Sequence, residues 1–298
     1  MKALRWLLVM TALTALFAVA GCGDDEEEPA AGGGKESAQK AEKFPADTTM
    51  GKIQDKGEIA IGVKYDVPPF GFKNPQSGDI EGFDIDVGQA IADKLGVKPK
   101  FIEAISDNRI PFLKNGTADL ILSTMTINKE RDLEIDFSEP YFVARGRVLV
   151  GPDSKITGVE DLKKGTSVCT ALGSTYEENL KKQAPQAERK LVDSYSECLE
   201  LIQNGAVDAV STDNVILTGM IIQDDTLKLV GDDLTTEPYG AGLKDGDTAF
   251  KEFVDSTIAE FKSDGRWKKT HEKWVSQYTN EPEEPPTMTL EEALEATS

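Results

Sequence analysis

Histidine and cysteine are scarce in this sequence: its 298 residues include one histidine, His271, and three cysteines. A histidine-based catalytic triad, or a zinc centre with histidine ligands, needs histidine beside other reactive groups. His271 lies near the end of the chain, away from the polar strand ends described below. The scarcity therefore argues against both kinds of site, and we predict no metal, no cofactor and no enzymatic activity.

Basic residues are also in deficit, with 33 Lys and Arg against 53 Asp and Glu and a formal net charge of −20 at pH 7. An acidic surface repels phosphate backbones and anionic lipid headgroups, so neither nucleic acid nor an anionic membrane surface is a predicted partner. A small anionic ligand stays compatible with this charge, because salt screens charges over about 8 Å at physiological ionic strength.

Only one long apolar run is present, from Trp6 to Ala20, and Lys2 and Arg5 precede it. A transmembrane helix needs about 20 consecutive apolar residues, whereas a shorter run after basic residues is typical of a signal peptide. We therefore predict that residues 1–21 are a signal peptide.

The apolar run ends in Val19-Ala20-Gly21-Cys22, which resembles a bacterial lipobox, where small residues precede the cysteine that receives the lipid. An acidic, glycine-rich segment that cannot form a core follows Cys22. We predict that residues 22–50 are a flexible acidic linker and that a lipid on Cys22 holds the protein on the outer face of the cell membrane. The alternative is an ordinary cleavage site followed by a cysteine.

The two remaining cysteines, Cys169 and Cys198, would then lie in an exported, oxidising setting, where disulfides persist. We expect them to pair, and the alternative is two free buried thiols. A disulfide closing this loop would stabilise the fold by about 3–4 kcal/mol in the chain-entropy model.

The body of the chain alternates between short apolar runs and amphipathic segments. The apolar runs are expected to form strands and the amphipathic segments helices. This alternation predicts an α/β fold. The predicted strands are 58–63, 100–104, 120–122, 147–150, 167–171 and 207–210.

Asp84 and Asp86 precede a helix predicted from about Val87 to Leu95. Two carboxylates so close together permit a metal site, but no histidine or third acid is near them in the sequence. We therefore interpret Asp86 as the residue that caps this helix.

The segment from Asp119 to Arg131 carries the clearest sign of a binding site. Its apolar strand ends in Ser123, Thr124, Met125 and Thr126, and an arginine follows a few residues later. Hydroxyls and free backbone N–H groups can donate to a carboxylate, and a guanidinium can bind both of its oxygens. In open α/β sheets such sites lie at the carboxyl ends of strands. The alternative is a polar turn with a surface arginine.

A second unit repeats this arrangement. Gly173-Ser174-Thr175 opens a helix after strand 167–171, so free N–H groups and hydroxyls gather there, and Asp213 follows strand 207–210. Each half also places Asn-Gly before an aspartate and its strand. This shared order predicts two similar α/β lobes.

Several segments, taken in order, resemble the polar amino-acid-binding proteins of ABC transporters, solute-binding family 3. The resemblance covers about residues 50–275. Within the family the sequence is most similar to lipid-anchored glutamate-binding proteins of actinobacterial type, because of Cys169, Cys198, Lys64 and Arg109. The segments are VKYDVPPFGF, GFDIDV, NGTADLILSTMTINKERDLEIDFSEPYF, GST at 173–175, VDAVSTD and PYGAGL.

The resemblance implies a two-lobe periplasmic-binding-protein fold of type II, in which two crossover segments form a hinge and the lobes close on the ligand. Lobe 1 would comprise residues 51–143 with 238–280, and lobe 2 residues 144–237. Residues 281–298 would form an acidic C-terminal tail. A monomer is expected.

The resemblance also implies a role for each polar strand end. Arg131 would bind the α-carboxylate of an amino acid, with help from Thr124 and Thr126. Thr175, with Ser174 at the helix start, would contact the same carboxylate from the other lobe. Asp213 would take the α-ammonium group.

The remaining site residues favour an acidic ligand. Lys64 and Arg109 add two cations, Ser106 stands where relatives that bind basic amino acids place an aromatic ring, and Tyr239 matches the glutamate binders. Counting Lys64, Arg109 and Arg131 against Asp213 gives an excess of positive charge, which a closed site must neutralise.

The resulting prediction is a receptor that captures L-glutamate, or L-aspartate, and delivers it to the permease and ATPase of an ABC importer. Three alternatives stay open. The first is that the ligand is glutamine or another polar amino acid. The second is that the protein is an amino-acid-sensing ectodomain, and the third is that the protein is an exported dehydratase of the same fold.

Overall fold

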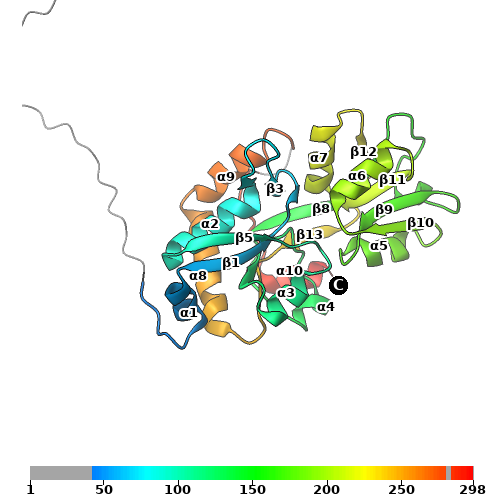
Figure 1. Ribbon diagram of the computed structural model, residues 1–298. Coiled ribbons are helices and arrows are strands. Elements are labelled where there is room, and N and C mark those ends of the chain that lie inside the picture. The colour runs from blue at the N-terminus through cyan, green and yellow to red at the C-terminus, as the bar shows by residue number, and fades with distance from the viewer. Residues whose placement is uncertain (1–41, 280–282, 298) are drawn as a thin grey trace, which may run out of the picture. The chain divides into compact units, whose positions relative to one another are not determined.

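A computed structural model describes residues 42–279 and 283–297. The predicted signal peptide, Cys22 and the linker as far as residue 41 lie outside the described residues. The described residues build two lobes, each around its own sheet, as Figure 1 shows.

The sheet of lobe 1 has the strand order β5-β1-β6-β14-β7. Strand β1 runs parallel to β5 and β6, and β14 runs antiparallel to β6 and β7. The carboxyl ends of β1 and β6 therefore meet at one edge. The strands are β1 (Glu58–Val63), β5 (Lys98–Glu103), β6 (Leu120–Ile121), β7 (Asp136–Phe137) and β14 (Gly242–Leu243); a small separate sheet holds β2 (Asp66–Val67), β3 (Gly71–Lys73) and β4 (Ile80–Glu81).

The helices of lobe 1 come from both ends of the chain. Glycine in the left-handed conformation follows several of them, as Gly96 does after α2. The helices are α1 (Thr49–Lys56), α2 (Phe83–Leu95), α3 (Arg109–Asn115), α4 (Lys129–Asp132), α8 (Thr248–Ser263), α9 (Arg266–Trp274) and α10 (Leu290–Ala296).

The sheet of lobe 2 has the strand order β10-β9-β11-β8-β12. Strands β9, β10 and β11 are parallel, so the carboxyl ends of β9 and β11 lie at one edge. The strands are β8 (Phe142–Val150), β9 (Ser167–Ala171), β10 (Glu188–Val192), β11 (Ala209–Asp213) and β12 (Lys228–Val230); the helices are η1 (Val159–Asp161), α5 (Tyr176–Gln183), α6 (Tyr195–Gln203) and α7 (Asn214–Gln223).

Two antiparallel strands connect the lobes (Figure 1). The chain enters lobe 2 along β8 and leaves it along β13 (Thr236–Tyr239), with Thr236 opposite Arg145 and Tyr239 opposite Phe142. The predicted two-lobe α/β fold with two crossover segments is confirmed. Pairing of the two crossovers joins them into one ribbon, which is the hinge.

Aromatic packing fixes the lobe 1 end of the hinge. The ring centroid of Phe142 lies 4.9 Å from that of Phe70 and 5.8 Å from that of Tyr239. Phe83 packs with Trp267 at 5.8 Å. Edge-to-face and offset pairs at such distances add about 0.5–1.5 kcal/mol each beyond the area they bury. Both crossovers are therefore anchored in the core of lobe 1.

The folded body extends beyond both ends that the sequence predicted. Helix α1 starts after its N-cap Thr48, and Phe44 packs edge-on against Phe253, so residues 44–50 are not part of a flexible linker. At the other end, Thr289 and Glu292 form a capping box at the start of α10. Helix α10 then buries Ala293 completely against lobe 1. A short acidic helix offers little apolar periodicity, which is why the sequence predicted only a tail.

Candidate functional site

The predicted site residues come together where the carboxyl ends of strands from both lobes face each other. Lys64 follows β1, Thr124 and Thr126 follow β6, and Asp213 ends β11. Seven of the nine predicted site residues line a cavity of about 10 Å³, whereas Lys64 and Tyr239 lie outside its lining. Its lining comprises Ser106, Arg109, Thr124, Thr126, Arg131, Ser174, Thr175, Tyr176, Tyr195 and Asp213.

Asp213 is the acid of this cavity, and two tyrosines hold its carboxylate. Tyr176 donates to Oδ1 at 2.8 Å, and Tyr239 from the hinge donates to Oδ2 at 2.7 Å. Burial, with the nearby charge of Glu237, raises the pKa of Asp213 to about 7. Asp213 precedes α7, but its side chain makes no capping hydrogen bond to that helix. The carboxylate therefore faces the cavity, where an ammonium group would satisfy it.

Arg131 is buried at the opposite wall. Its Nη1 donates to the carbonyl of Thr126 at 2.7 Å, and its Nη2 donates across the cleft to the carbonyl of Gly173 at 3.0 Å. The side chain of Asn128 accepts from the backbone N–H of Arg131 and caps α4, so this short helix sets where the arginine starts. The alternative of a surface arginine is wrong.

Arg109 is buried beside it, and backbone carbonyls already occupy most of its donors. Nε donates to Ser106 at 3.1 Å, Nη1 to Ser123 at 2.9 Å and Nη2 to Gly173 at 3.3 Å. Burial and the charge of Arg131 lower the pKa of Arg109 to about 9. Arg109 therefore ties strand ends together, and it is not the spare cation that the sequence predicted.

Lys64 occupies the inner end of the site and is 1% exposed. Its Nζ donates to the Ser106 hydroxyl at 2.8 Å and lies 5.6 Å from the ring centroid of Tyr195. Burial, with the charge of Arg109, lowers the pKa of Lys64 to about 7. Near neutral pH this amine therefore exists in both its charged and its neutral form.

Sequence reasoning missed the buried Asp84. The backbone N–H of Thr124, which has a left-handed φ of 44°, donates to Asp84 at 2.9 Å, and Tyr141 donates to it at 2.7 Å. Helix α2 begins at Phe83, so Asp86 is not its cap; Asp86 instead accepts from the indole of Trp274. The sequence signal that could have identified Asp84 as a site residue is an acid at the start of a helix that precedes a hydroxyl-rich strand end.

Glu237 on β13 was missed as well. Its carboxylate accepts hydrogen bonds from Thr126 of lobe 1 and Thr175 of lobe 2. With Asp84 and Glu237 included, three buried acids face the three buried cations. The predicted excess of positive charge is therefore wrong, because two of the acids come from parts of the chain that the sequence did not place in the site.

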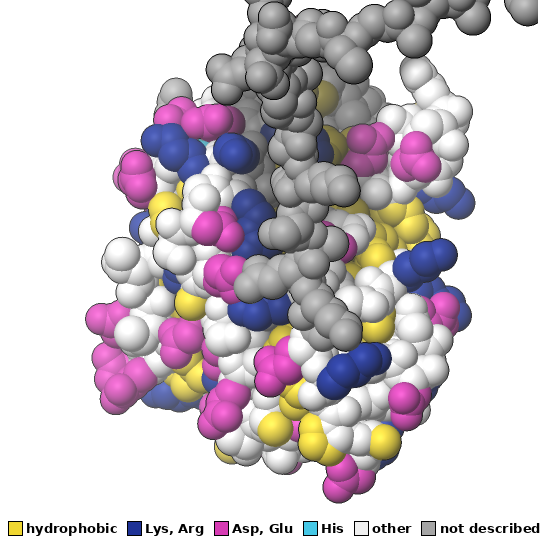
Figure 2. Space-filling view, turned by 90° about the vertical axis from the view of Figure 1, so that its left-hand side faces the viewer, with side chains coloured by type: hydrophobic (Ala, Val, Ile, Leu, Met, Phe, Trp, Pro, Cys, Tyr) yellow, Lys and Arg dark blue, Asp and Glu magenta, His cyan; other side chains and the backbone are white. Residues whose placement is uncertain are grey.

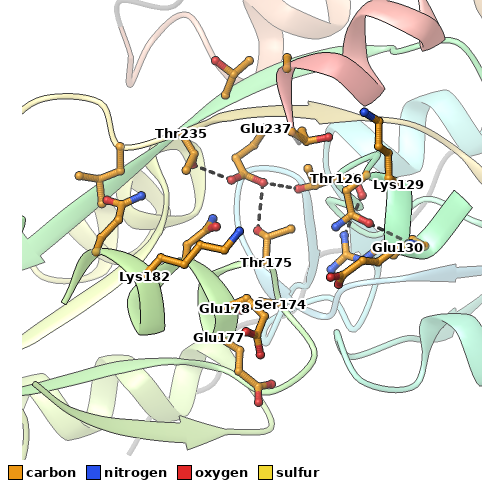
Figure 3. Close-up of a pocket in the computed structure, with 18 of the residues that line it drawn as sticks. Thr126, Lys129, Glu130, Ser174, Thr175, Glu177, Glu178, Lys182, Thr235 and Glu237 are labelled. Carbon is orange, nitrogen blue, oxygen red and sulfur yellow. Dashed lines mark hydrogen bonds between the residues drawn. The ribbon is translucent and has the colours of Figure 1, made fainter. Parts of the chain in front are cut away.

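A larger cavity has a volume of about 1080 Å³, and Figure 3 shows residues that line it. The two share Thr126, Arg131, Ser174 and Thr175. The walls of the larger cavity mix acids, bases and amides, and they do not include Asp213. We therefore place the candidate site in the small cavity and interpret the larger one as its entrance.

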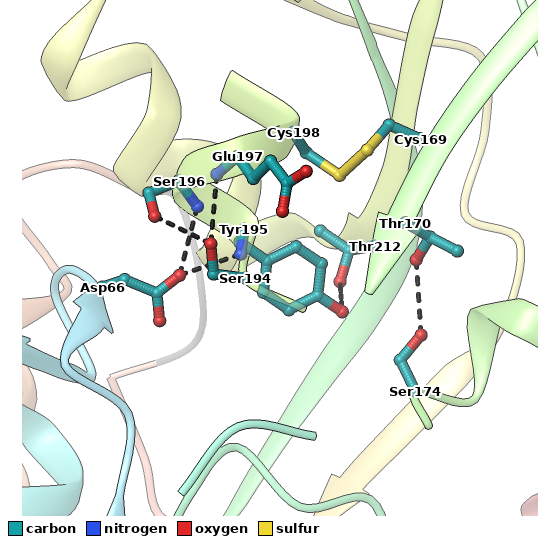
Figure 4. Close-up of a disulfide and its surroundings, with 10 residues drawn as sticks. All are labelled: Asp66, Cys169, Thr170, Ser174, Ser194, Tyr195, Ser196, Glu197, Cys198 and Thr212. Carbon is teal, nitrogen blue, oxygen red and sulfur yellow. Dashed lines mark hydrogen bonds between the residues drawn. A yellow bond between two sulfur atoms is a disulfide. The ribbon is translucent and has the colours of Figure 1, made fainter. Parts of the chain in front are cut away.

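The predicted disulfide between Cys169 and Cys198 is confirmed, with their Cα atoms 5.6 Å apart (Figure 4). It joins β9 to α6, whose first residue is Tyr195. The Thr212 hydroxyl donates to the Tyr195 oxygen at 2.7 Å, and Asp66 of lobe 1 accepts from the Tyr195 backbone N–H at 2.8 Å. The disulfide therefore steadies the helix that carries one wall of the site.

Gly173 of lobe 2 makes a close contact with lobe 1. Its carbonyl accepts from both arginines of lobe 1, its φ is +72°, and an added Cβ would lie 2.6 Å from the Cα atom of Asp107. Gly205 has the same φ with open space around it, which makes it a matched control.

Gly173→Ala is therefore expected to hold the lobes apart and to lower ligand affinity by roughly 10-fold to 100-fold, the cost of overpacking a close contact. Gly205→Ala should cost a similar backbone strain with no change in affinity. Calorimetry and melting curves on both variants separate these effects. Equal affinities in the two variants would show that Gly173 has no role in closure.

The described residues show neither a one-sign charged face in Figure 2 nor a membrane span nor a metal cluster. On the face shown in Figure 2, basic and acidic side chains are intermixed outside the grey region. Within residues 42–279 and 283–297, no helix is long and apolar enough to cross a membrane. The same residues contain no group of three or more potential metal ligands.

The chain is similar to known binding proteins over most of its length. It is 40% identical to the ABC transporter glutamine-binding protein GlnH of Bacillus subtilis strain 168, over 91% of this chain and 96% of that protein. It is 42% identical to the glutamine-binding protein of Geobacillus stearothermophilus, over 80% and 91%. The glutamate-binding protein GluB of Corynebacterium glutamicum is 32% identical, over 72% and 77%.

Solved structures agree with these relatives. An ancestral arginine-binding protein bound to glutamine is 39% identical, with a TM-score of 0.70 over 74% of this chain and 98% of that chain. An ancestral amino acid-binding protein described as a precursor of cyclohexadienyl dehydratase is 34% identical, with a TM-score of 0.70 over 77% and 100%. The model of the bacterial extracellular solute-binding proteins, family 3, matches residues 59–277, and the chain belongs to this family.

Proposed function

We propose that this protein captures L-glutamine outside the cytoplasm and delivers it to the permease and ATPase of an ABC importer. The observation that carries the proposal is the charge balance of the site. With every group counted as ionised, the charges of Lys64, Arg109 and Arg131 equal those of three buried acids, so a ligand of no net charge leaves the closed cleft balanced. An acidic ligand would add a charge that a buried site must neutralise at a cost.

Each group of glutamine has a partner in this arrangement. Asp213 accepts from the α-ammonium group, and Arg131 donates to the α-carboxylate in place of the Gly173 carbonyl that it now contacts. The side-chain amide lies toward Lys64 and Ser106. Because Lys64 titrates near pH 7, its amine either donates to the amide oxygen or accepts from the amide N–H.

Binding requires the lobes to move apart. A cavity of about 10 Å³ has room for no more than a water molecule. The ligand therefore enters through the larger cavity, displaces the Gly173 carbonyl from the arginines and is enclosed again as the hinge closes. Capture by closure suits a carrier that hands its ligand to a membrane complex.

Glutamate is the second candidate ligand. Lys64 favours it whenever the amine is charged, and two glutamate-binding relatives are 31% and 32% identical to this chain. Two glutamine-binding relatives at 40% and 42% identity favour glutamine. The dehydratase alternative is supported by one structural relative, described as a precursor of cyclohexadienyl dehydratase, and we propose no catalytic role.

A panel of the twenty amino acids, screened by the melting temperature of the protein, tests this proposal. A ligand at 100 times its dissociation constant stabilises the protein by about 2.7 kcal/mol. Glutamine is expected to raise the melting temperature most. If only arginine, histidine or cysteine raises it, the assignment to glutamine is wrong although the family assignment stands.

We also propose that a lipid on Cys22 anchors the protein to the outer face of the membrane. The support is the Val19-Ala20-Gly21-Cys22 sequence, which lies outside the described residues. Cys22→Ala is expected to move the protein from the membrane fraction to the soluble fraction with unchanged affinity for its ligand. Fractionation and calorimetry check both parts, and processed Cys22→Ala protein that stays in the membrane fraction would contradict the proposal.

A further inference from the structure

Glu237 lies at a point where both lobes and the hinge meet. It lies on the crossover strand β13 and is 2% exposed. Its Oε2 accepts from Thr126 Oγ1 of lobe 1 at 2.7 Å and from Thr175 Oγ1 of lobe 2 at 3.0 Å (Figure 3). Its Oε1 accepts from Thr235 Oγ1 at 2.6 Å. Both carboxylate oxygens are therefore engaged, and the side chain has a fixed place.

These bonds fix what the two hydroxyls offer to a ligand. A threonine hydroxyl has one proton, and the hydroxyls of Thr126 and Thr175 each donate it in a hydrogen bond to Glu237. Both residues line the small cavity, and toward it their hydroxyl oxygens present only lone pairs. They are then acceptors, suited to an ammonium or amide N–H group and unsuited to a carboxylate. The sequence had predicted the opposite role, that of donors to a carboxylate.

The charge of Glu237 acts on the same cavity. The carboxylate lies directly behind two lining hydroxyls, close to Arg131 and Asp213, whose pKa values respond to its charge. Without Glu237 the site would hold one more cation than acids. The ionisable groups that face Asp213 there are Lys64, Arg109, Arg131, Tyr176, Tyr195, Tyr239 and Glu237.

We propose that Glu237 is a specificity-determining residue, which makes the site select an amino acid of no net charge and reject an acidic one. This inference rests on the proposed function, because it explains the choice of glutamine over glutamate. Glu237 does not line the small cavity itself. It acts as a positioning residue, through the orientation of two hydroxyls and through its charge.

Glu237→Gln tests the proposal, because the amide keeps one oxygen that accepts from both threonines and removes the charge. The readout is the ratio of the glutamate and glutamine dissociation constants, measured by calorimetry. We expect the ratio to fall on the order of tenfold or more in favour of glutamate, as charge pairs at this range in a closed site predict. Glu178→Gln, on the rim of the larger cavity, removes the same charge and should leave the ratio unchanged.

A second readout is the pH profile of glutamine binding. Removing the charge of Glu237 lowers the pKa of Asp213, so the loss of affinity in acid should begin at lower pH than in the parent protein. If Glu237 had only a structural role, its replacement would lower the affinities for glutamine and glutamate equally and leave the pH profile of glutamine binding unchanged. That result, an unchanged ratio with an unchanged profile, would overturn the proposal.

Thr175→Val keeps the proposal testable if Glu237→Gln does not fold. The variant removes one hydroxyl and keeps the charge, so the preference for glutamine should persist even if both affinities fall. If the preference disappears although the carboxylate remains, the charge of Glu237 does not discriminate, and the part of the proposal that rests on that charge is wrong. The proposed function is judged on the parent protein alone, whereas this inference is judged on the change of ratio, so the two can fail separately.

Discussion

Asp213→Asn is expected to weaken glutamine binding by roughly 30-fold to several thousand-fold, because truncating one member of a buried charge pair costs about 2–5 kcal/mol. The ammonium group of the proposed ligand would lose the buried carboxylate assigned to it. Two tyrosines hold this side chain in place, and asparagine has nearly the same shape, so the loss would report the charge. An unchanged dissociation constant would remove Asp213 from the site.

The stability of the unliganded variant separates binding from folding. The pKa of Asp213 is raised from 3.8 to about 7, so above pH 7 the folded protein holds an ion that burial disfavours. The free energy of unfolding therefore falls as pH rises between these two values, and asparagine removes that cost. At pH 8 the melting temperature of Asp213→Asn should not be lower than that of the parent.

The same residue predicts how binding depends on pH. Below pH 7 part of the unliganded protein has Asp213 protonated, and an ammonium group can bind only after that proton leaves. Affinity for glutamine should therefore fall as pH drops below about 7, by up to about tenfold per unit. Lys64 and Asp84 titrate in the same range, so the contribution of Asp213 is the difference between the profiles of the parent and Asp213→Asn.

Arg131→Met should have an effect of similar size. Hydrogen bonds to charged groups contribute about 1.5–3 kcal/mol each, so losing a two-point contact with the α-carboxylate should weaken binding by roughly 100-fold or more. Arg131→Lys keeps the charge but loses the planar guanidinium that can donate to both carboxylate oxygens. Its affinity should therefore lie between those of Arg131→Met and the parent protein. Calorimetry on the three proteins gives the order.

Arg109→Met is the matched comparison. Arg109 donates to the buried carbonyls of Ser106, Ser123 and Thr124, whereas the Gly173 carbonyl also accepts from Arg131. Removing Arg109 takes a donor from each of those three carbonyls and should lower the melting temperature more than Arg131→Met does. If Arg131→Met keeps parental affinity and Arg109→Met abolishes it, the assignment of the carboxylate to Arg131 is wrong.

The sequence predicted the parts of this site that local patterns encode. Strand ends rich in hydroxyls gave Thr124, Thr126 and Asp213, and a turn followed by arginine gave Arg131. Each is set by its own strand and turn, and the alternation of strands and helices places those strand ends at one edge of each sheet.

The balance of charge was not predictable in this way. Thr126 and Glu237 are 111 residues apart, and Thr124 and Asp84 are 40 apart. No local pattern marks an acid on a hinge strand as part of a site, because its partners are set by the closure of two lobes. The sequence therefore counted three cations and one acid, and the acidic ligand followed from that count.

The prediction for the C-terminal end of the chain was wrong for a related reason. Helix α10 buries one alanine fully, with Met288, Leu290 and Leu294 partly covered on lobe 1. A helix of seven residues is marginal by itself and forms because it packs against lobe 1. Its acidic composition is typical of a mobile tail, so only the capping residues indicated that a helix was present.

Glutamine and glutamate titrated into the parent protein by calorimetry at pH 7.5 give the most direct test of the central claim, that this balanced site selects an amino acid of no net charge. The account predicts that glutamine binds with the lower dissociation constant and that glutamate binds at least tenfold more weakly, since a charge left unmatched in a closed cleft costs more than about 1.4 kcal/mol. A lower dissociation constant for glutamate would contradict it.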